Sequence, residues 1–176
     1  MRTKDEYGDR RGFTLVEIMI VIAILGILVV LAVGNFGGMN EKYKVEAETK
    51  QLYADLMDVR GRAMQRNRWF FVRLSGTAPD YTGYATYEDG PLPDGDTAPN
   101  SSDTLVTNVT VRHRINSSLA GGGSFGFNRN GIANDDGTIF FASSAKPDYN
   151  CITIRSTRIK MGEYLGTFPG GTCIEK

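Results

Sequence analysis

The chain has 176 residues, of which 41% are hydrophobic and 21 are glycine, and this composition suits one globular domain plus one membrane segment. Lysine and arginine total 20, and aspartate and glutamate also total 20, so the chain has no net charge at pH 7. This balance excludes a broad electrostatic field that attracts nucleic acid or an anionic surface, and we expect partners to be recognised by shape.

A short leader, residues 1–12, precedes the first apolar stretch. It holds four basic residues, Arg2, Lys4, Arg10 and Arg11. Because basic residues beside an apolar span favour the cytoplasmic side of a membrane, we expect the carboxy-terminal domain to be exported. An ordinary secretory signal is disfavoured, because no small-residue cleavage site follows the apolar core and that core is too long.

Residues 13–33 are apolar except for one carboxylate, Glu17. As a helix they extend about 31 Å, close to the roughly 30 Å thickness of the hydrocarbon layer of a bilayer. We therefore predict a single-pass membrane helix followed by an exported domain. A carboxylate at this depth is costly unless it is paired, which predicts a functional role for Glu17. The alternative is that Glu17 reaches the cytoplasmic headgroups and pairs with nothing.

The junction between leader and apolar stretch reads Arg10-Arg11-Gly12-Phe13-Thr14-Leu15-Val16-Glu17. It resembles the class III signal of type IV pilins and pseudopilins. The resemblance implies that prepilin peptidase, a membrane-embedded aspartyl peptidase, cuts after Gly12 and methylates the new amino terminus of Phe13. A side chain at Gly12 would obstruct the approach of the scissile backbone. In an assembled filament, Glu17 is then expected to pair with the amino terminus of a neighbouring subunit.

Residues 34–66 are predicted to continue the helix in amphipathic form. A stripe of apolar residues repeats at helical spacing and requires a partner surface: Val45, Leu52, Leu56, Val59 and Ala63. Opposite charges also occur at helical spacing, Lys44 with Glu48 and Glu46 with Lys50. These pairs predict a solvent-exposed opposite face.

Residues 67–176 form a β-rich domain with short strands separated by turn residues. We expect strands at 69–74, 81–87, 105–115, 124–128, 138–141, 152–155 and 158–161. In the third of these, alternating residues from Val109 to Ile115, including His113, share one face, with Thr110 and Arg112 on the other. Such a strand is half buried.

A second resemblance lies in the domain and in the helix that leads into it. The helix end at 52–67 is similar to that of the H-type minor pseudopilins and their pilus-assembly relatives. The order of later motifs also follows that group: Phe125-Gly126-Phe127, Gly137-Thr138-Ile139, Ile152-Thr153-Ile154 and Thr157-Arg158-Ile159. The resemblance implies an α+β pilin fold, in which the long amino-terminal helix packs on an antiparallel sheet.

Two cysteines, Cys151 and Cys173, both lie in the exported part. In an oxidising periplasm they could form a disulfide, and the alternative is two unpaired thiols. Their number and spacing do not make a metal site. Oxygen ligands for calcium occur at Asp135, Asp136 and nearby asparagines, but their spacing favours a plain turn.

No nucleophile and carboxylate accompany the single histidine, His113, in sequence, so we predict a structural histidine, no enzymatic activity and no cofactor. The prediction is a minor pseudopilin of a type II secretion system, or a minor pilin, whose partners are other pilins, the peptidase and an inner-membrane platform. The alternative is a DNA-binding minor pilin that uses two basic groups: Arg60, Arg62, Arg66, Arg68 and Arg73, and Arg155, Arg158 and Lys160.

Overall fold

The computed structural model describes residues 12–90 and 99–176, with the side chains of residues 32–38 left aside. The chain divides into two compact units, Met1–Met39 and Asn40–Lys176. Residues 1–11 of the leader and residues 91–98 lie outside the described residues.

One helix, α1 (Leu15–Arg66), contributes to both units. Its first turn is capped by Thr14, whose hydroxyl accepts the N–H of Glu17 at 3.2 Å. Its last turn is followed by Asn67, which adopts a left-handed backbone with φ 54° and ends the helix. Among the described residues, no helix combines the length and the apolar character that crossing a membrane requires.

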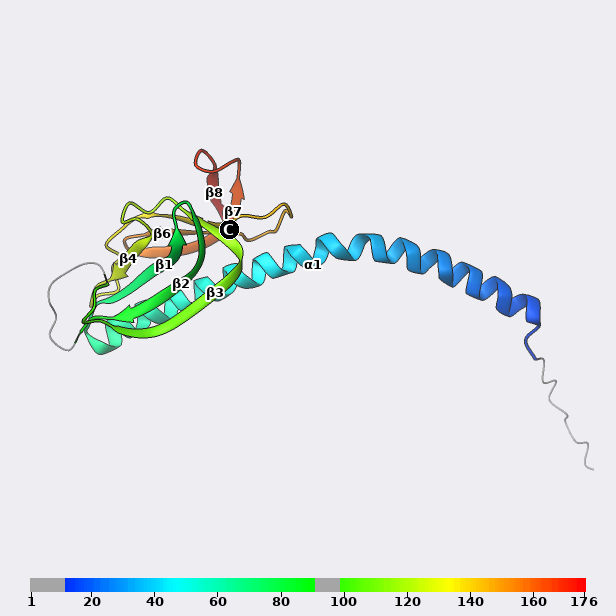
Figure 1. The fold of residues 1–176 in the computed structure, drawn as a ribbon, viewed down its shortest axis with the longest axis horizontal. Helices are drawn as coiled ribbons and strands as arrows, with labels where there is room; N and C mark the ends of the chain where they lie inside the picture. Colours follow the sequence, from blue (N-terminus) through cyan, green and yellow to red (C-terminus); the bar gives the residue numbers. More distant parts are fainter. Residues whose placement is uncertain (1–11, 91–98) are drawn as a thin grey trace, which may run out of the picture. The chain divides into compact units, whose positions relative to one another are not determined.

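The second unit contains a single antiparallel sheet (Figure 1), which confirms the predicted α+β fold class. In chain order its strands are β1 (Phe70–Thr77), β2 (Asp80–Glu88), β3 (Thr104–Ser117), β4 (Ser124–Phe127), β5 (Gly137–Phe141), β6 (Cys151–Arg155), β7 (Arg158–Leu165) and β8 (Thr172–Glu175). In space their order is β4-β1-β2-β3-β5-β6-β7-β8. The long strand β3 links the two halves, because Tyr84 of β2 pairs with Val109 near its middle and Phe141 of β5 pairs with Ile115 near its end.

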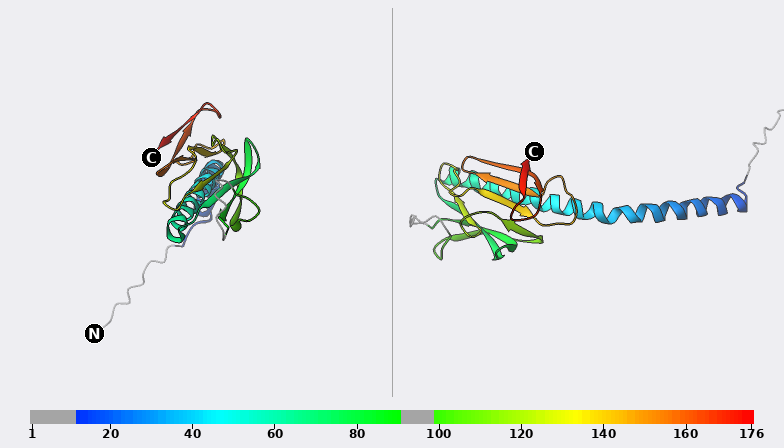
Figure 2. Two further views of the ribbon diagram at one scale, coloured as in Figure 1. Left: turned by 90° about the vertical axis from the view of Figure 1, so that its left-hand side faces the viewer. Right: turned by 90° about the horizontal axis from the view of Figure 1, so that it is seen from above.

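The core lies between the second half of α1 and one face of the sheet, as the end-on view in Figure 2 shows. The predicted helix stripe forms the helical side of this core, since all its members are at most 2% exposed: Val45, Leu52, Leu56, Val59 and Ala63. Alternate strand residues such as Ile115, Ile139 and Ile152 face them from the sheet. The period of 3.6 residues on the helix and of 2 residues on the strands therefore selects the buried faces.

All seven expected strands are present, and the eighth strand, β8, is the one that the sequence analysis missed. The segment has only four residues and follows a turn that contains Gly166, Pro169 and Gly171, so its β signal is weak. The predicted alternation in β3 is confirmed, because Val109, Val111 and His113 are half-buried while the residues between them are exposed.

The prediction of a solvent-exposed face at Glu46 and Glu48 was wrong. Glu46 is only 8% exposed, and its carboxylate accepts the backbone N–H of Asp148 at 3.0 Å in addition to facing Lys50. Glu48 binds β3, and Lys44 pairs with Glu41 instead. The carboxylates of Glu46 and Glu48 are engaged because the loop at Asp148 and the strand β3 lie against this side of α1, which helical spacing alone does not reveal.

Candidate assembly site and its anchoring contacts

The predicted processing junction lies directly before α1. Gly12 and Phe13 are outside the helix, and both are exposed, Phe13 to 80%. A Cβ placed on Gly12 would meet no atom within 4 Å, so the fold itself does not require glycine at this position. Any requirement for glycine there must therefore come from a partner molecule.

Glu17 lies in the first turn of α1, where its backbone N–H is bound by Thr14. A carboxylate at this end is favourable because the helix dipole places partial positive charge there. Thr14 and Glu17 have the spacing of a capping box, a signal that the sequence analysis missed. The side chain of Glu17 is exposed and available to a group outside its own chain.

Apolar side chains surround the first part of α1 on every side. Consecutive positions such as Leu15 and Val16, or Val29, Val30 and Leu31, are between 59% and 76% exposed. Because successive helical residues differ by about 100° in direction, such a run leaves no polar face. An apolar surface of this size requires a non-aqueous environment, either lipid or neighbouring helices.

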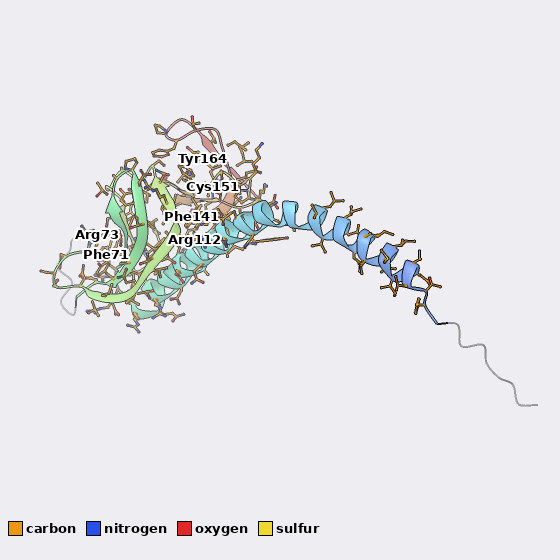
Figure 3. All side chains as sticks on the ribbon, turned by 45° about the vertical axis from the view of Figure 1, so that its right-hand side comes forward. Phe71, Arg73, Arg112, Phe141, Cys151 and Tyr164 are labelled. Carbon is orange, nitrogen blue, oxygen red and sulfur yellow. A yellow bond between two sulfur atoms is a disulfide. The ribbon has the colours of Figure 1, made fainter. Side chains whose placement is uncertain are left out.

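The second half of α1 is held to the sheet by Glu48. One of its carboxylate oxygens accepts the backbone N–H of Arg112 at 2.8 Å, and the other accepts the backbone N–H of His113 at 3.2 Å. The second oxygen also lies 2.7 Å from Nδ1 of the His113 ring. One carboxylate thus serves three donors of β3, the strand on which Figure 3 labels Arg112.

The other ring nitrogen of His113, Nε2, lies 3.2 Å from Glu41, about two helical turns before Glu48. The pKa of the Glu41 carboxyl lies below its ordinary value because Lys44 and then His113 hydrogen bond to it. For a carboxyl with a lowered pKa, the stabilising contribution is present at neutral pH and is lost as the pH falls through that lowered pKa. His113 therefore contributes to holding α1 against β3 through two carboxylates.

Replacing Glu48 with alanine is expected to lower the free energy of unfolding by about 1–3 kcal/mol, because three donors on β3 lose their acceptor. The measurement is urea unfolding of the full chain in mild detergent, followed by tryptophan fluorescence. The matched control is Asp58→Ala, since Asp58 is an exposed helical carboxylate that pairs with Arg62 of the same helix. The control should change stability by less than about 0.5 kcal/mol, and an equal effect of both variants would contradict the anchoring role.

A second set of contacts ties the carboxy terminus to α1. Lys42 of the helix binds the Asp148 carboxylate at 3.0 Å, and this lysine holds the pKa of Asp148 below its usual range. The terminal residue Lys176 donates to the Glu163 carboxylate at 2.8 Å and to the backbone carbonyl of Asp148 at 3.2 Å. Lys176 thereby connects the end of β8 to β7 and to Asp148, the loop residue that Lys42 of α1 also binds.

Cys151 of β6 and Cys173 of β8 form a disulfide, with Cα atoms 6.1 Å apart. The bond passes over β7, where Gly162 is the register partner of Cys151. A Cβ on Gly162 would lie 3.1 Å from the sulfur of Cys173 and 2.1 Å from the backbone oxygen of Ile174, so glycine is needed for this close approach. Figure 3 labels Cys151 and also Tyr164, the register partner of Cys173 on β7.

The basic residues considered for DNA binding are mostly engaged within the chain. Arg62 pairs with Asp58, Arg66 with Glu88, and Arg68 donates to the backbone carbonyls of Asp89 and Gly90. Near the carboxy terminus, Arg158 and Lys160 share Glu175 at 3.5 and 3.3 Å. Neutralised cations have little charge to offer to phosphates, so this arrangement disfavours the DNA-binding alternative.

The oxygens considered as calcium ligands accept hydrogen bonds within turns. Asp135 accepts the N–H of Gly121 at 3.0 Å, and Asn128 accepts the N–H groups of Asn130 and Ile132. Within the part of the chain that the structure describes, no three His, Cys, Asp or Glu residues gather in a geometry that could hold a metal ion.

Comparisons with known proteins bear on both parts of the chain. A family model described as a prokaryotic N-terminal methylation motif matches residues 8–33, and a model described as type II transport protein GspH matches residues 48–157. The first match contains Gly12, Phe13 and Glu17. The second begins in α1 and covers the sheet as far as the turn between β6 and β7.

Two curated proteins match shorter segments. The type IV major pilin protein PilA of Myxococcus xanthus is 36% identical over 96 residues, which are 46% of this chain and 44% of that protein. The type II secretion system core protein G of Klebsiella pneumoniae is 46% identical over 52 residues, 30% of this chain and 34% of that protein. The chain therefore spans less than half the length of these relatives.

Among solved structures, the minor pseudopilin EpsH from the type 2 secretion system of Vibrio cholerae is similar in fold. The superposition has a TM-score of 0.50 and covers 68% of this chain and 96% of that chain, at 10% sequence identity. At this identity the likeness concerns the fold alone.

Proposed function

Because the chain belongs to the GspH family of type II transport proteins and carries the N-terminal methylation motif, we propose that it is a non-enzymatic minor subunit of a type II secretion pseudopilus or a related type IV pilus. The observation that carries the proposal is the first part of α1, which is apolar on every side and follows directly on the Gly12–Phe13 junction. A helix of this kind functions when other helices or lipid surround it.

Prepilin peptidase cleaves the chain after Gly12 and methylates the released amine of Phe13. The exposed, non-helical backbone at this junction supports the proposal, because a peptidase must bind its substrate in an extended form. The described helix begins at Leu15, so cleavage leaves α1 with its Thr14 cap intact.

Glu17 then sets the axial position of the subunit by pairing with the amino terminus of a neighbour. Inside a bundle of apolar helices, water is excluded, and a carboxylate without a cation would be strongly unfavourable. The Phe13 amine is the suitable cation, and one ion pair per contact fixes a single stagger between helices.

Before assembly the chain lies in the inner membrane as a single-pass protein with its domain in the periplasm. The basic leader supports this orientation, and so does the Cys151–Cys173 disulfide, because disulfides persist in oxidising compartments. An inner-membrane platform with its ATPase supplies the work of extraction. Contacts between unlike patches of successive subunits generate an open helical polymer.

The test is recovery of the chain from filaments sheared off cells that produce it, with mass spectrometry of its amino terminus. We expect a mature chain that begins at N-methylated Phe13 in the filament fraction. Deleting the gene while scoring protein secretion and piliation in parallel identifies which assembly it serves. Filaments of normal composition that lack the chain, together with unprocessed protein in the membrane, would contradict the proposal.

A further inference from the structure

One edge of the sheet is covered and the other is open. At β4, the backbone N–H of Gly126 donates to the side chain of Asn134 at 2.7 Å and its carbonyl accepts the N–H of Asn134 at 3.0 Å. At the opposite edge, β8 pairs with β7 and with no further strand among the described residues. Figure 1 shows this hairpin at the margin of the sheet.

The hydrogen bonding of β7 determines which backbone groups of β8 point outward. Lys176 donates its N–H to Met161 at 3.0 Å, and the register pairs Glu175 with Gly162 and Cys173 with Tyr164. Because bonded and non-bonded pairs alternate in an antiparallel ladder, Thr172 and Ile174 bond to β7. The N–H and C=O groups of Cys173 and Glu175 therefore point away from the sheet.

Of the devices that usually protect an exposed strand, this edge has its short length, the charge of Glu175 and the adjacent Lys176. Between Thr172 and Glu175 there is no proline, lysine or bulge, and the register with β7 is regular. Ile174 remains 46% exposed, and Leu165, its diagonal neighbour on the same face, is 52% exposed. The disulfide holds β8 to β6, so the open edge is rigid and loses little conformational entropy on pairing.

The edge is complementary to itself. If two copies of β8 are placed antiparallel about a two-fold axis at Ile174, Cys173 of each copy faces Glu175 of the other, and every outward N–H and C=O finds a partner. The two Ile174 side chains then form a non-bonded pair, the type in which side chains approach most closely. The carboxylate of Glu175 is already neutralised by Arg158 and Lys160, so the contact adds no charge repulsion.

We propose that β8 is an interaction surface for a second copy of this chain, which joins two sheets into one across a two-fold axis. The contact closes after two copies, because the β4 edge of each is covered. A four-residue strand makes a small interface, so association is weak and depends on concentration. The proposal goes beyond filament assembly through α1 and does not depend on it.

The first test compares Glu175→Pro with its matched control Glu175→Ala in the full chain in detergent micelles, by sedimentation equilibrium. Proline removes only the outward N–H of residue 175, and an edge strand tolerates it there. Alanine keeps the N–H and removes the same ion pairs with Arg158 and Lys160. We expect the alanine variant to dimerise like the wild type and the proline variant to dimerise at least about tenfold more weakly, because two interchain hydrogen bonds are lost.

A wild-type chain that stays monomeric at all concentrations, or a proline variant that dimerises as well as the alanine variant, overturns the proposal. An intact disulfide in each variant verifies folding. Association through the apolar part of α1 is common to all variants, so it does not change the difference in dimerisation strength between the proline and alanine variants. The assay contains no assembly machinery, so its failure would leave the proposed filament function untouched.

A second test uses the position on the axis. Ile174→Lys and Ile174→Glu should each abolish dimerisation, because like charges then face each other, while an equimolar mixture should restore it through opposite charges. Dimerisation of either variant alone at wild-type strength, or failure of the mixture to associate, counts against the two-fold register. The charge substitutions at Ile174 therefore support or refute the two-fold contact through β8 even if the proline variant does not fold.

Discussion

Replacing Gly12 with valine is expected to leave the chain unprocessed, with its first twelve residues attached and its amino terminus unmethylated. The rate of cleavage should fall by about 100-fold or more, since a displacement of about 1 Å at the scissile bond has an effect of that size. The measurement is the intact mass of the chain after expression with its peptidase, supported by the shift of the band on a gel.

The structure makes this result interpretable. A Cβ added at Gly12 meets no atom of the chain within 4 Å, so we expect valine there to leave the fold undisturbed and loss of processing to report on the peptidase. The matched control is Gly26→Ala, another exposed glycine at which an added Cβ meets nothing within 4 Å, and it should be processed normally. Cleavage of the valine variant at the wild-type rate would remove the basis for assigning Gly12 to the cleavage site.

Replacing Glu17 with glutamine or with alanine is expected to permit processing but to prevent entry into filaments. Losing the carboxylate leaves the amine of a neighbouring Phe13 uncompensated in an apolar bundle, at a cost of about 3–5 kcal/mol. This corresponds to at least about a 100-fold decrease in incorporation. The measurement is the ratio of the variant to the wild type in sheared filaments from cells that produce both.

The comparison of the two substitutions separates pairing from helix capping. Glutamine at this position can still accept a hydrogen bond from the backbone at the helix start, as a capping box requires, whereas alanine cannot. If the charge is what matters, the two variants fail equally. Normal incorporation of the glutamine variant would show that Glu17 acts only on its own helix. Asp58→Asn, at an exposed carboxylate farther along α1 that pairs with Arg62 of the same helix, serves as the control and should assemble normally.

The fold class and the core of the helix were predictable from short-range patterns. Leu52, Leu56 and Val59 are buried because helical period alone puts them on one side, and any partner surface of sufficient size satisfies them. The same holds for β3, where alternation distinguishes Val109 and Val111 from the residues between them. The resemblance to pilin signals also rests on contiguous residues, which is why the junction at Gly12 is visible without a structure.

The anchoring contacts were not predictable in this way. The spacing of Lys44 and Glu48 suggested an ion pair along the helix, but Glu48 binds the backbone of β3, which is 64 residues away in sequence. Backbone N–H groups carry no sequence signal, so a carboxylate that binds them looks like any exposed acid. For the same reason the outward groups of β8 become evident only when its register with β7 is known.

The amino-acid sequence by itself determined the amphipathic helix and the lone carboxylate Glu17, and it predicts the leader and the processing junction at Gly12 and Phe13, because each depends on residues within a few turns of one another. The tertiary structure alone decided that Glu48 joins α1 to β3, that Gly162 lies beneath the disulfide, and that one sheet edge is covered while β8 stays open. These features depend on which distant backbones come within hydrogen-bonding distance, and strand order and register set those distances.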